Sequence, residues 1–236
     1  MQLSIVIPVY NERNNIPLLV SKINSTLNDK IKHEIIIVDD SSTDGSTQTL
    51  KKLEKKVKKL KVIFRKNKER DLSKSCRDGF ELSKYNYIVV MDGDLQHDPI
   101  YIPKMIKILN KNNSDFVIGV RDLRNKRIKS LSFFRQFLSL SIIKIFEFFF
   151  EKKTNDPMSG FFLFKKKIYL NNKKKLFLKG FKILADLIYL NKKFKINDLK
   201  IKFNYRKKGK SKLNLRIALI IVQFLFIRFF KNLLIK

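Results

Sequence analysis

The sequence is short of the residues from which several kinds of protein site are built. Its 236 residues include one cysteine, Cys76, two histidines, His33 and His97, and no tryptophan. A single cysteine excludes an internal disulfide framework and a cysteine-rich zinc site, and two histidines exclude a metal cage of several imidazoles. Seven glycines and five prolines exclude a collagen-like or low-complexity chain. The first residues do not have the pattern of a secretory signal peptide, so we expect a cytoplasmic protein.

Acidic residues are also scarce, and they are unevenly distributed. The chain has 52 lysines and arginines against 21 aspartates and glutamates, a formal net charge of +31. Residues 1–150 hold 28 basic and 17 acidic residues (+11), whereas residues 151–236 hold 24 basic and 4 acidic residues (+20). Such a field attracts phosphates, whether of nucleic acid, of an anionic membrane or of a phosphorylated substrate. A lysine-rich codon bias explains part of the excess, but not why the second part has so few acids.

Long uninterrupted apolar runs are absent as well. Two phenylalanine-rich segments, residues 131–150 and 213–236, hold 11 of the 21 phenylalanines, but charged side chains interrupt both of them. In the second segment, Val222, Phe226 and Phe229 fall on one helical face. This pattern predicts amphipathic helices in a membrane interface, with an anionic membrane surface as partner. Helices packed on the sheet, or a tilted C-terminal helix that spans the membrane, are the alternatives.

Short apolar runs alternate with segments of helical periodicity through the first half of the chain. We expect strands at residues 3–9, 33–40, 61–65, 85–92 and 115–121, and helices at residues 14–27, 45–59, 73–84 and 99–110. Residues 195–205, further along the chain, are also strand-like. The alternation predicts an α/β fold with a doubly wound, mostly parallel sheet and helices on both faces. Ligands of such sheets bind beyond the carboxyl ends of the strands.

Polar residues follow the predicted strands at these ends. Asp92 and Asp94 come after the fourth strand in the sequence DGDLQ, which also supplies Gln96. Because carboxylate and amide oxygens are ligands that Mg²⁺ and Mn²⁺ prefer, these residues predict a divalent metal site. A simple turn is the alternative. Asp40 ends the second strand, where a carboxylate can accept hydrogen bonds from a ribose or a base.

Basic residues could complete such a site. Arg121 ends the fifth predicted strand, and residues 206–212 form the loop RKKGKSK. A basic loop that contains glycine can close over phosphates, although a solvated turn is the simpler interpretation. We expect His97 and Cys76 to be structural.

Eight motifs now point to a known family. They are IVIPVYNE (5–12), VDDSSTDGS (38–46), DLSKSCRDGF (71–80), MDGDLQHDP (91–99), GVRD (119–122), DPMSGFFLF (156–164), GFKILADL (180–187) and RKKGKSKL (206–213). The chain resembles family 2 glycosyltransferases of the GT-A fold. Within that family it is most similar to the polyprenyl-phosphate hexose synthases of the dolichol-phosphate mannosyltransferase group.

The resemblance implies an activity, a cofactor and a location. It implies an inverting glycosyltransferase that moves a hexose, mannose from GDP-mannose first of all, to a polyprenyl or dolichyl phosphate. The alternative is a family 2 transferase that uses UDP-glucose or a UDP-N-acetylhexosamine, with a polyprenyl phosphate or a soluble glycan as acceptor. The resemblance also implies Mg²⁺ or Mn²⁺ as cofactor. The protein would be peripheral or weakly anchored on the cytoplasmic face of a membrane. Nucleic acid is not an expected partner, because the aromatic residues cluster in apolar segments.

The resemblance also implies boundaries. A Rossmann-like GT-A domain would cover residues 1–212, with an interfacial helical insertion at about residues 128–150. The C-terminal amphipathic helix would cover residues 213–236.

The resemblance implies roles for individual residues. Those that would hold the base and ribose are Pro8, Tyr10, Glu12, Val38 and Asp40, and those that would contact the sugar nucleotide are Asp92 and Gly93. The metal ligands would be Asp92, Asp94 and Gln96, and the phosphate-binding residues Arg121, Arg206 and Lys212. Asp92, Asp94 and Arg121 would then be the catalytic residues. The chain departs from the family pattern at Ser41, Thr43 and Asp71, where other residues are usual, and this affects the expected loop shapes.

Overall fold

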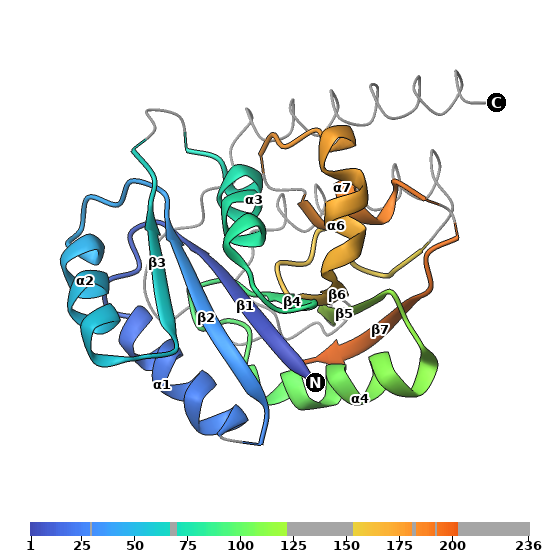
Figure 1. Ribbon diagram of the computed structural model, residues 1–236, viewed down its shortest axis with the longest axis horizontal. Coiled ribbons are helices and arrows are strands. Elements are labelled where there is room, and N and C mark those ends of the chain that lie inside the picture. The colour runs from blue at the N-terminus through green and yellow to red at the C-terminus, as the bar shows by residue number, and fades with distance from the viewer. Residues whose placement is uncertain (29, 67–69, 122–152, 181–182, 192, 203–236) are drawn as a thin grey trace, which may run out of the picture.

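The structure, a computed structural model, describes the chain except for residues 29, 67–69, 122–152, 181–182, 192 and 203–236. Several predictions therefore lie outside the described residues: the helices at 128–150 and 213–236, the boundary after residue 212, and the basic loop at 206–212. The described residues form an α/β fold around one seven-stranded sheet (Figure 1). No helix in this part of the chain is long and apolar enough to cross a bilayer.

The sheet has the strand order β3-β2-β1-β4-β6-β5-β7. Its strands are β1 (Gln2–Val9), β2 (Lys32–Asp39), β3 (Leu60–Phe64), β4 (Tyr87–Val90), β5 (Phe116–Arg121), β6 (Phe162–Lys165) and β7 (Ile196–Ile201). Parallel pairing joins β3, β2, β1 and β4 in turn, and also joins β5 to β7. Strand β6 runs antiparallel between β4 and β5. The prediction of a mostly parallel sheet is confirmed, and β6 is a strand that was not predicted.

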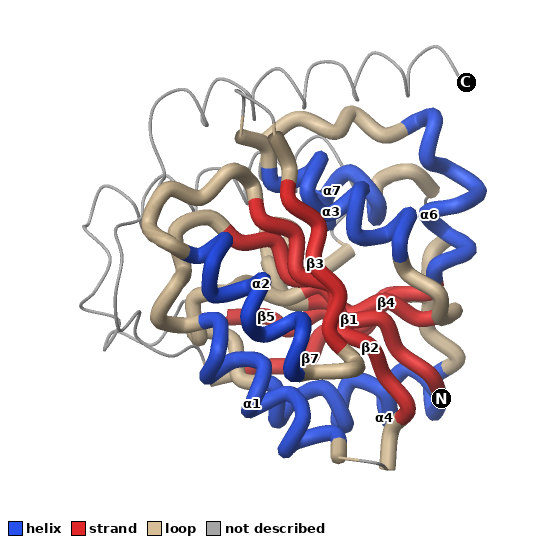
Figure 2. The backbone as a smooth tube through the Cα atoms, turned by 60° about the vertical axis from the view of Figure 1, so that its left-hand side comes forward, coloured by secondary structure: helices blue, strands red, loops and turns tan. Residues whose placement is uncertain are grey.

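Helices cover both faces of the sheet, as predicted (Figures 1 and 2). One face carries α1 (Ile16–Leu27), α2 (Ser46–Lys56) and α4 (Ile102–Asn112), and the other carries α3 (Leu72–Leu82), α6 (Lys166–Asn172) and α7 (Ile183–Ile188). Two short 3-10 helices, η1 (Pro99–Tyr101) and η2 (Lys173–Lys175), complete the described elements. Strands covered on both faces bury nearly every side chain, which explains the continuous apolar runs of β1 and β2.

Aspartate side chains cap the first turns of α3 and η1. The side chain of Asp71 accepts a hydrogen bond from the backbone N–H of Lys74 at 3.1 Å and so caps α3. Asp98 caps η1 in the same way, and Pro99 follows it, as the sequence predicts. The predicted helix at residues 99–110 therefore opens as a 3-10 turn before it becomes α4.

Candidate functional site

The carboxyl ends of β1, β2 and β4 meet at one edge of the sheet. The parallel register places Val9 beside Asp39 and Val6 beside Val90, so the loops that follow these strands are neighbours. Three residues in those loops have positive φ although none is glycine. They are Asn11 (56°), Ser41 (62°) and Leu95 (65°). Such conformations are uncommon and concentrate at functional sites, which marks this edge as the candidate site.

The turn after β4 presents the two predicted metal-binding carboxylates. The side chain of Asp92 is 35% exposed, whereas Asp94 is buried and accepts a hydrogen bond from the backbone N–H of Gln96 at 3.1 Å. A Cβ at Gly93 would lie 2.7 Å from a methyl group of Val9, and a Cβ at Gly160 would collide with the Asp92 carboxylate. The turn is therefore packed closely between the end of β1 and the segment that leads into β6.

Arg121, at the end of β5, is held by a buried carboxylate. Its Nε donates to Asp156 Oδ2 at 2.6 Å and its Nη2 donates to Asp156 Oδ1 at 2.9 Å. The Arg121 side chain is 23% exposed, while Asp156 is fully buried. Asp156, together with the charge of Asp92, raises the pKa of Arg121 despite its burial. A two-point pair of this kind fixes the plane of the guanidinium group.

His97 lies beneath the same carboxylates. Its ring stacks on Phe161 with centroids 5.3 Å apart, and its Nδ1 is 3.5 Å from Asp92 Oδ2. Burial lowers the pKa of His97 to about 4, against the opposing charges of Asp94 and Asp156. The imidazole is therefore neutral near pH 7, and the cation at this end of the site is Arg121.

Asp40, at the end of β2, is the centre of a second group of charges. One oxygen pairs with the Nη1 of Arg65, and Oδ2 accepts a hydrogen bond from the backbone N–H of Asp71 at 2.7 Å. Desolvation raises the pKa of Asp40, and the Arg65 charge opposes that rise. The neighbouring Asp39 instead shapes the loop, because its oxygens accept from Ser42 N (3.1 Å) and Thr47 Oγ1 (2.8 Å).

The remaining predicted nucleotide-binding residues lie at the ends of β1 and β2. Pro8 and Val38 are register partners inside the sheet. Tyr10 lies 4.2 Å beneath the guanidinium of Arg70, and Glu12 Oε2 accepts from Asn15 Nδ2 at 2.6 Å. The structure therefore brings these residues to the edge that also carries Asp40, and their contacts with a ligand stay predictions.

The residues at the turn after β4 fit a divalent cation. Asp92 and Asp94 supply carboxylates and Gln96 supplies an amide, and Mg²⁺ and Mn²⁺ bind oxygen ligands of these kinds. Within the described ranges, no group of three or more histidine, cysteine, aspartate or glutamate side chains is arranged to hold a metal ion. A cation here would thus need the Gln96 oxygen, water or a phosphate to complete its ligands.

The sequence predicts no part in the site for several residues of this edge. They are Arg65, Asp156 and Gly160, and also His97 and Asp71. A signal existed for Asp71, since an aspartate three residues before Lys74 and just ahead of an apolar-periodic segment is typical of a helix cap. Nothing in the pattern pairs Arg121 with Asp156, because 35 residues separate them. Arg206 and Lys212 lie outside the described residues.

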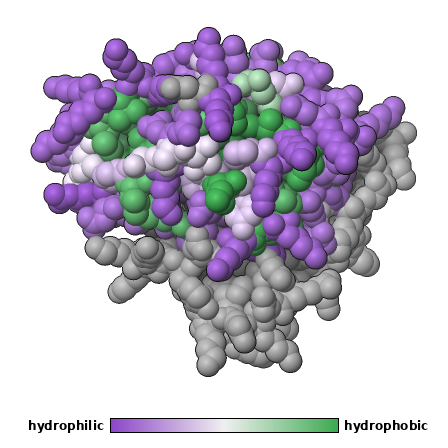
Figure 3. All heavy atoms as spheres, turned by 90° about the horizontal axis from the view of Figure 1, so that it is seen from below, coloured by the Kyte–Doolittle hydropathy of each residue, from purple (hydrophilic) through white to green (hydrophobic). Residues whose placement is uncertain are grey.

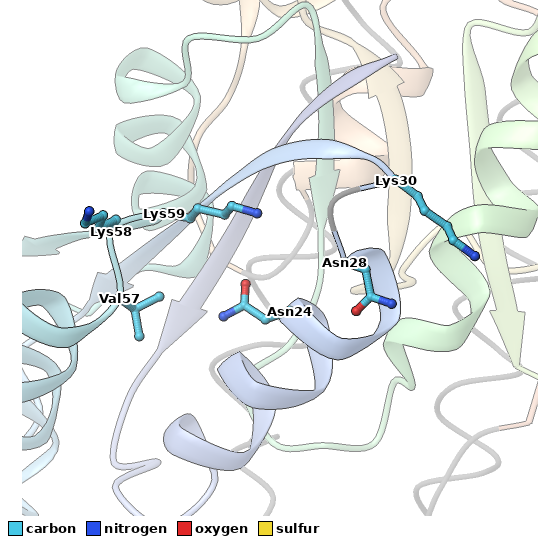
Figure 4. A pocket seen from close by; sticks show the side chains of 6 residues that line it. All are labelled: Asn24, Asn28, Lys30, Val57, Lys58 and Lys59. Carbon is cyan, nitrogen blue, oxygen red and sulfur yellow. The ribbon is translucent and has the colours of Figure 1, made fainter.

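Two surface hollows occur at the opposite, amino-terminal edge of the sheet. One of about 810 Å³ is lined by Asn24, Asn28, Lys30, Val57, Lys58 and Lys59. The other, of about 410 Å³, shares Lys58 and Lys59 and includes the buried Glu34. The lysine side chains of the larger hollow extend in different directions (Figure 4), and the face seen from below is mostly hydrophilic (Figure 3). Lysine side chains line much of both hollows, which lie away from the candidate site.

The fold is that of solved GT-A glycosyltransferases. Glucosyl-3-phosphoglycerate synthase from Mycobacterium tuberculosis, in complex with Mn²⁺, UDP-glucose and phosphoglyceric acid, matches with a TM-score of 0.71 at 15% identity, over 97% of this chain and 79% of that one. A mannosyltransferase from Pyrobaculum calidifontis, in complex with GDP-mannose and Mn²⁺, matches with a TM-score of 0.62 at 14% identity, over 99% and 64%. These likenesses show that the chain has the GT-A fold.

The sequence places the chain within that class. The model of glycosyl transferase family 2 matches residues 4–171, so the chain belongs to this family and is a glycosyltransferase. It is 36% identical to dolichol-phosphate mannosyltransferase of Pyrococcus furiosus over 90% of this chain, which spans 59% of that protein's length. It is 31% identical to the Saccharomyces cerevisiae protein of the same name, over 95% of this chain and 85% of that one. The expected family and its similarity to this group are confirmed.

Proposed function

We propose that the protein transfers mannose from GDP-mannose to a polyprenyl or dolichyl phosphate, with inversion at the sugar. The observation that carries the proposal is the pair of carboxylates after β4, Asp92 and Asp94, together with Arg121, which Asp156 holds and on which the charge of Asp92 acts. This arrangement suits a donor with a diphosphate and an acceptor that is itself a phosphate. The likeness to dolichol-phosphate mannosyltransferases of two organisms supports mannose and a lipid phosphate as the transferred group and the acceptor.

The donor nucleotide would lie across the ends of β1 and β2. Its base and ribose would contact Pro8, Tyr10, Glu12, Val38 and Asp40. Asp40 is an acceptor in this role, because its carboxylate has sites for about four hydrogen bonds. Arg65, the backbone of Asp71 and the Ser75 hydroxyl are its partners among the described residues.

The donor diphosphate would lie at the turn after β4. Asp92, Asp94 and Gln96 would hold Mg²⁺ or Mn²⁺, and Asp92 and Gly93 would contact the sugar nucleotide. When bound, the cation supplies charge neutralisation for the departing diphosphate. Mn²⁺ accompanies the nucleotide sugars in the two solved neighbours, which supports a divalent cofactor.

The transfer itself needs little proton chemistry from the protein. A phosphate monoester has a second pKa of about 6, so the acceptor oxygen is already ionised near neutral pH. That oxygen attacks the anomeric carbon, the bond from this carbon to the diphosphate oxygen breaks, and the nucleoside diphosphate leaves with the electron pair. His97, neutral and buried, is not required as a base. Catalysis then rests on positioning and electrostatics.

The basic groups would counter the repulsion between the two phosphates. Asp156 holds the Nε and Nη2 of Arg121, and this guanidinium would bring its positive charge to a phosphate. Arg206 and Lys212 are proposed to join it from the basic loop. The net charge of +20 over residues 151–236 supports an anionic membrane surface as the place where the lipid acceptor is met, at the cytoplasmic face.

A donor screen tests this function. Purified protein is incubated with Mn²⁺, polyprenyl phosphate in anionic vesicles, and labelled GDP-mannose, UDP-glucose or UDP-N-acetylglucosamine, and the lipid products are separated. We expect a mannosyl lipid from GDP-mannose, and none from the Asp94→Ala variant. Transfer from UDP-glucose alone would favour the UDP-sugar alternative, and transfer to a soluble glycan alone would remove the lipid acceptor.

A further inference from the structure

Arg65 is a buried cation to which the proposed function gives no role of its own. It lies just after β3, its side chain is 2% exposed, and it pairs with two carboxylates. Nη1 pairs with Asp40, and Nε lies 3.1 Å from Asp78 Oδ2 on α3. Nη1 also donates to Ser75 Oγ at 3.0 Å and to the backbone carbonyl of Asp71 at 3.2 Å. Burying a guanidinium is costly, and its pairing with two carboxylates offsets that cost, which indicates a specific role.

Asp71 extends the same network to a distant part of the chain. Its backbone N–H donates to Asp40, while its side-chain Oδ2 accepts from the backbone N–H of Gly180 at 2.9 Å. Ser73 reinforces this junction, since its N–H and its hydroxyl both donate to the carbonyl of Gly180. Asp71 therefore joins the start of α3, the end of β2 and the segment before α7. It is also a position at which this chain departs from the family pattern.

Asp40 is the point where this network reaches the site. Its side chain is 8% exposed, and Arg65 and the Asp71 backbone approach different oxygens. Partners on both oxygens, with the Ser75 hydroxyl as a further hydrogen-bonding group, leave the carboxylate little freedom to rotate. The Arg65 charge also favours the ionised form of Asp40, which burial alone disfavours. Both effects keep Asp40 as a fixed acceptor of hydrogen bonds.

We propose that Arg65 and Asp71 are positioning residues for the nucleotide end of the site, and that they act through Asp40. The inference rests on the proposed function in one respect, namely that Asp40 contacts the base or ribose of the donor. Neither residue is required to touch the substrate. The reacting end of the site, at Asp92, Asp94 and Arg121, is held by other contacts.

Because Arg65 acts at the nucleotide end and not at the reacting end, its replacement should change the KM for the donor and not kcat. When Arg65 is replaced, the nucleotide is bound less tightly, whereas the geometry at the anomeric carbon is unchanged once the donor is bound. We expect the affinity for the nucleotide to fall about tenfold, which corresponds to about 1.4 kcal/mol. The KM for the donor should rise by about that factor, and kcat should stay within about twofold.

The chain supplies a matched control for this substitution. Arg77 is an exposed arginine on α3 that donates to the other oxygen of Asp78, at 2.7 and 2.9 Å. Arg77→Gln removes a guanidinium from the same carboxylate without changing the partners of Asp40. Ser75→Ala is a milder change, which removes one hydroxyl between Arg65 and Asp71.

The test measures GDP and UDP binding by calorimetry in the presence of Mn²⁺, and steady-state transfer, for the full chain and these three variants. We expect Arg65→Gln to weaken nucleotide binding about tenfold, Ser75→Ala to weaken it about two- to threefold, and Arg77→Gln to leave it unchanged. If Arg65→Gln does not fold, Ser75→Ala against Arg77→Gln decides. Wild-type affinity in Arg65→Gln, or a loss confined to kcat, overturns the inference. Nucleotide binding by a wild type that transfers no mannose overturns the proposed function instead, and the binding comparison still decides the inference.

Discussion

The candidate site contains two arginines that pair with carboxylates, and the two pairs have opposite arrangements. In one pair the arginine is the supporting residue, and in the other the carboxylate is. At the end of β3, Arg65 is almost wholly buried and joins Asp40 to Asp78, so the arginine fixes an acid that the proposal places against the nucleotide. At the end of β5, Arg121 is partly exposed and Asp156 is fully buried, so the acid fixes an arginine that the proposal places against a phosphate.

The difference shows how one sheet edge can carry both acceptors and donors of hydrogen bonds. In each pair the buried partner is the support, and the partner nearer the edge is the group available to a ligand. The supports also differ in redundancy. Arg65 contacts two carboxylates and a hydroxyl. The Asp156 carboxylate makes the two-point pair with Arg121, and the N–H of Asp156 donates a 3.3 Å hydrogen bond to Thr154 Oγ1.

The largest loss of stability is expected when Asp156, which has fewer partners than Arg65, loses its charge. Asp156→Asn takes the negative charge from a buried ion pair, and breaking such a pair costs about 3–5 kcal/mol. Asp40→Asn should cost less, because Arg65 retains Asp78. Denaturant unfolding of both variants gives the free energies of unfolding. Equal losses, or a larger loss for Asp40→Asn, would contradict the comparison.

A second prediction concerns the dependence of stability on pH at the Arg121 end. The pKa of His97 is lowered from 6.5 to about 4 in the folded chain. Between these pH values the unfolded chain holds a proton there that the folded chain lacks, so stability falls as the pH decreases from 6.5 to 4. His97→Gln should remove this contribution, which amounts to at most about 3 kcal/mol.

The measurement is the unfolding free energy of wild type and His97→Gln at pH 4, 5, 6 and 7, without added metal. The difference between the two proteins should change across this window and stay constant above about pH 7. A difference that does not vary with pH would mean that His97 is not held neutral.

The smallest loss of stability is expected at Asp198, which contacts the turn that carries Asp156 and not the ion pair itself. Asp198, on β7, accepts hydrogen bonds from Thr154 Oγ1 (2.6 Å) and from the backbone and side chain of Asn155 (2.8 and 2.6 Å), and so holds the turn that carries Asp156. Asp198→Asn should cost about 1–2 kcal/mol and reduce transfer less than Asp156→Asn does. A loss as large as that of Asp156→Asn would show that the turn, not the ion pair, is the main support.

The sequence predicts much of this architecture because the strands of a covered sheet are continuous apolar runs. The five strands predicted in the first half correspond to β1–β5, and the strand-like segment at 195–205 contains β7. Asp92 and Asp94 follow β4 as expected. Strand β6 has only four residues and lies outside the regular alternation, so no periodicity marks it. The supports of the site are not predictable for a similar reason. Arg65 and Asp78, or Arg121 and Asp156, are brought together by the sheet and not by any spacing along the chain.

The most direct test of the account is whether the turn after β4 binds a divalent cation together with the nucleotide. Mn²⁺ binding is followed by electron paramagnetic resonance, with and without GDP, in wild type, Asp94→Ala and the control Arg77→Gln. The account predicts that wild type and Arg77→Gln bind Mn²⁺ more tightly when GDP is present, and that Asp94→Ala loses this binding while keeping its fold. Undiminished Mn²⁺ binding by Asp94→Ala would contradict it.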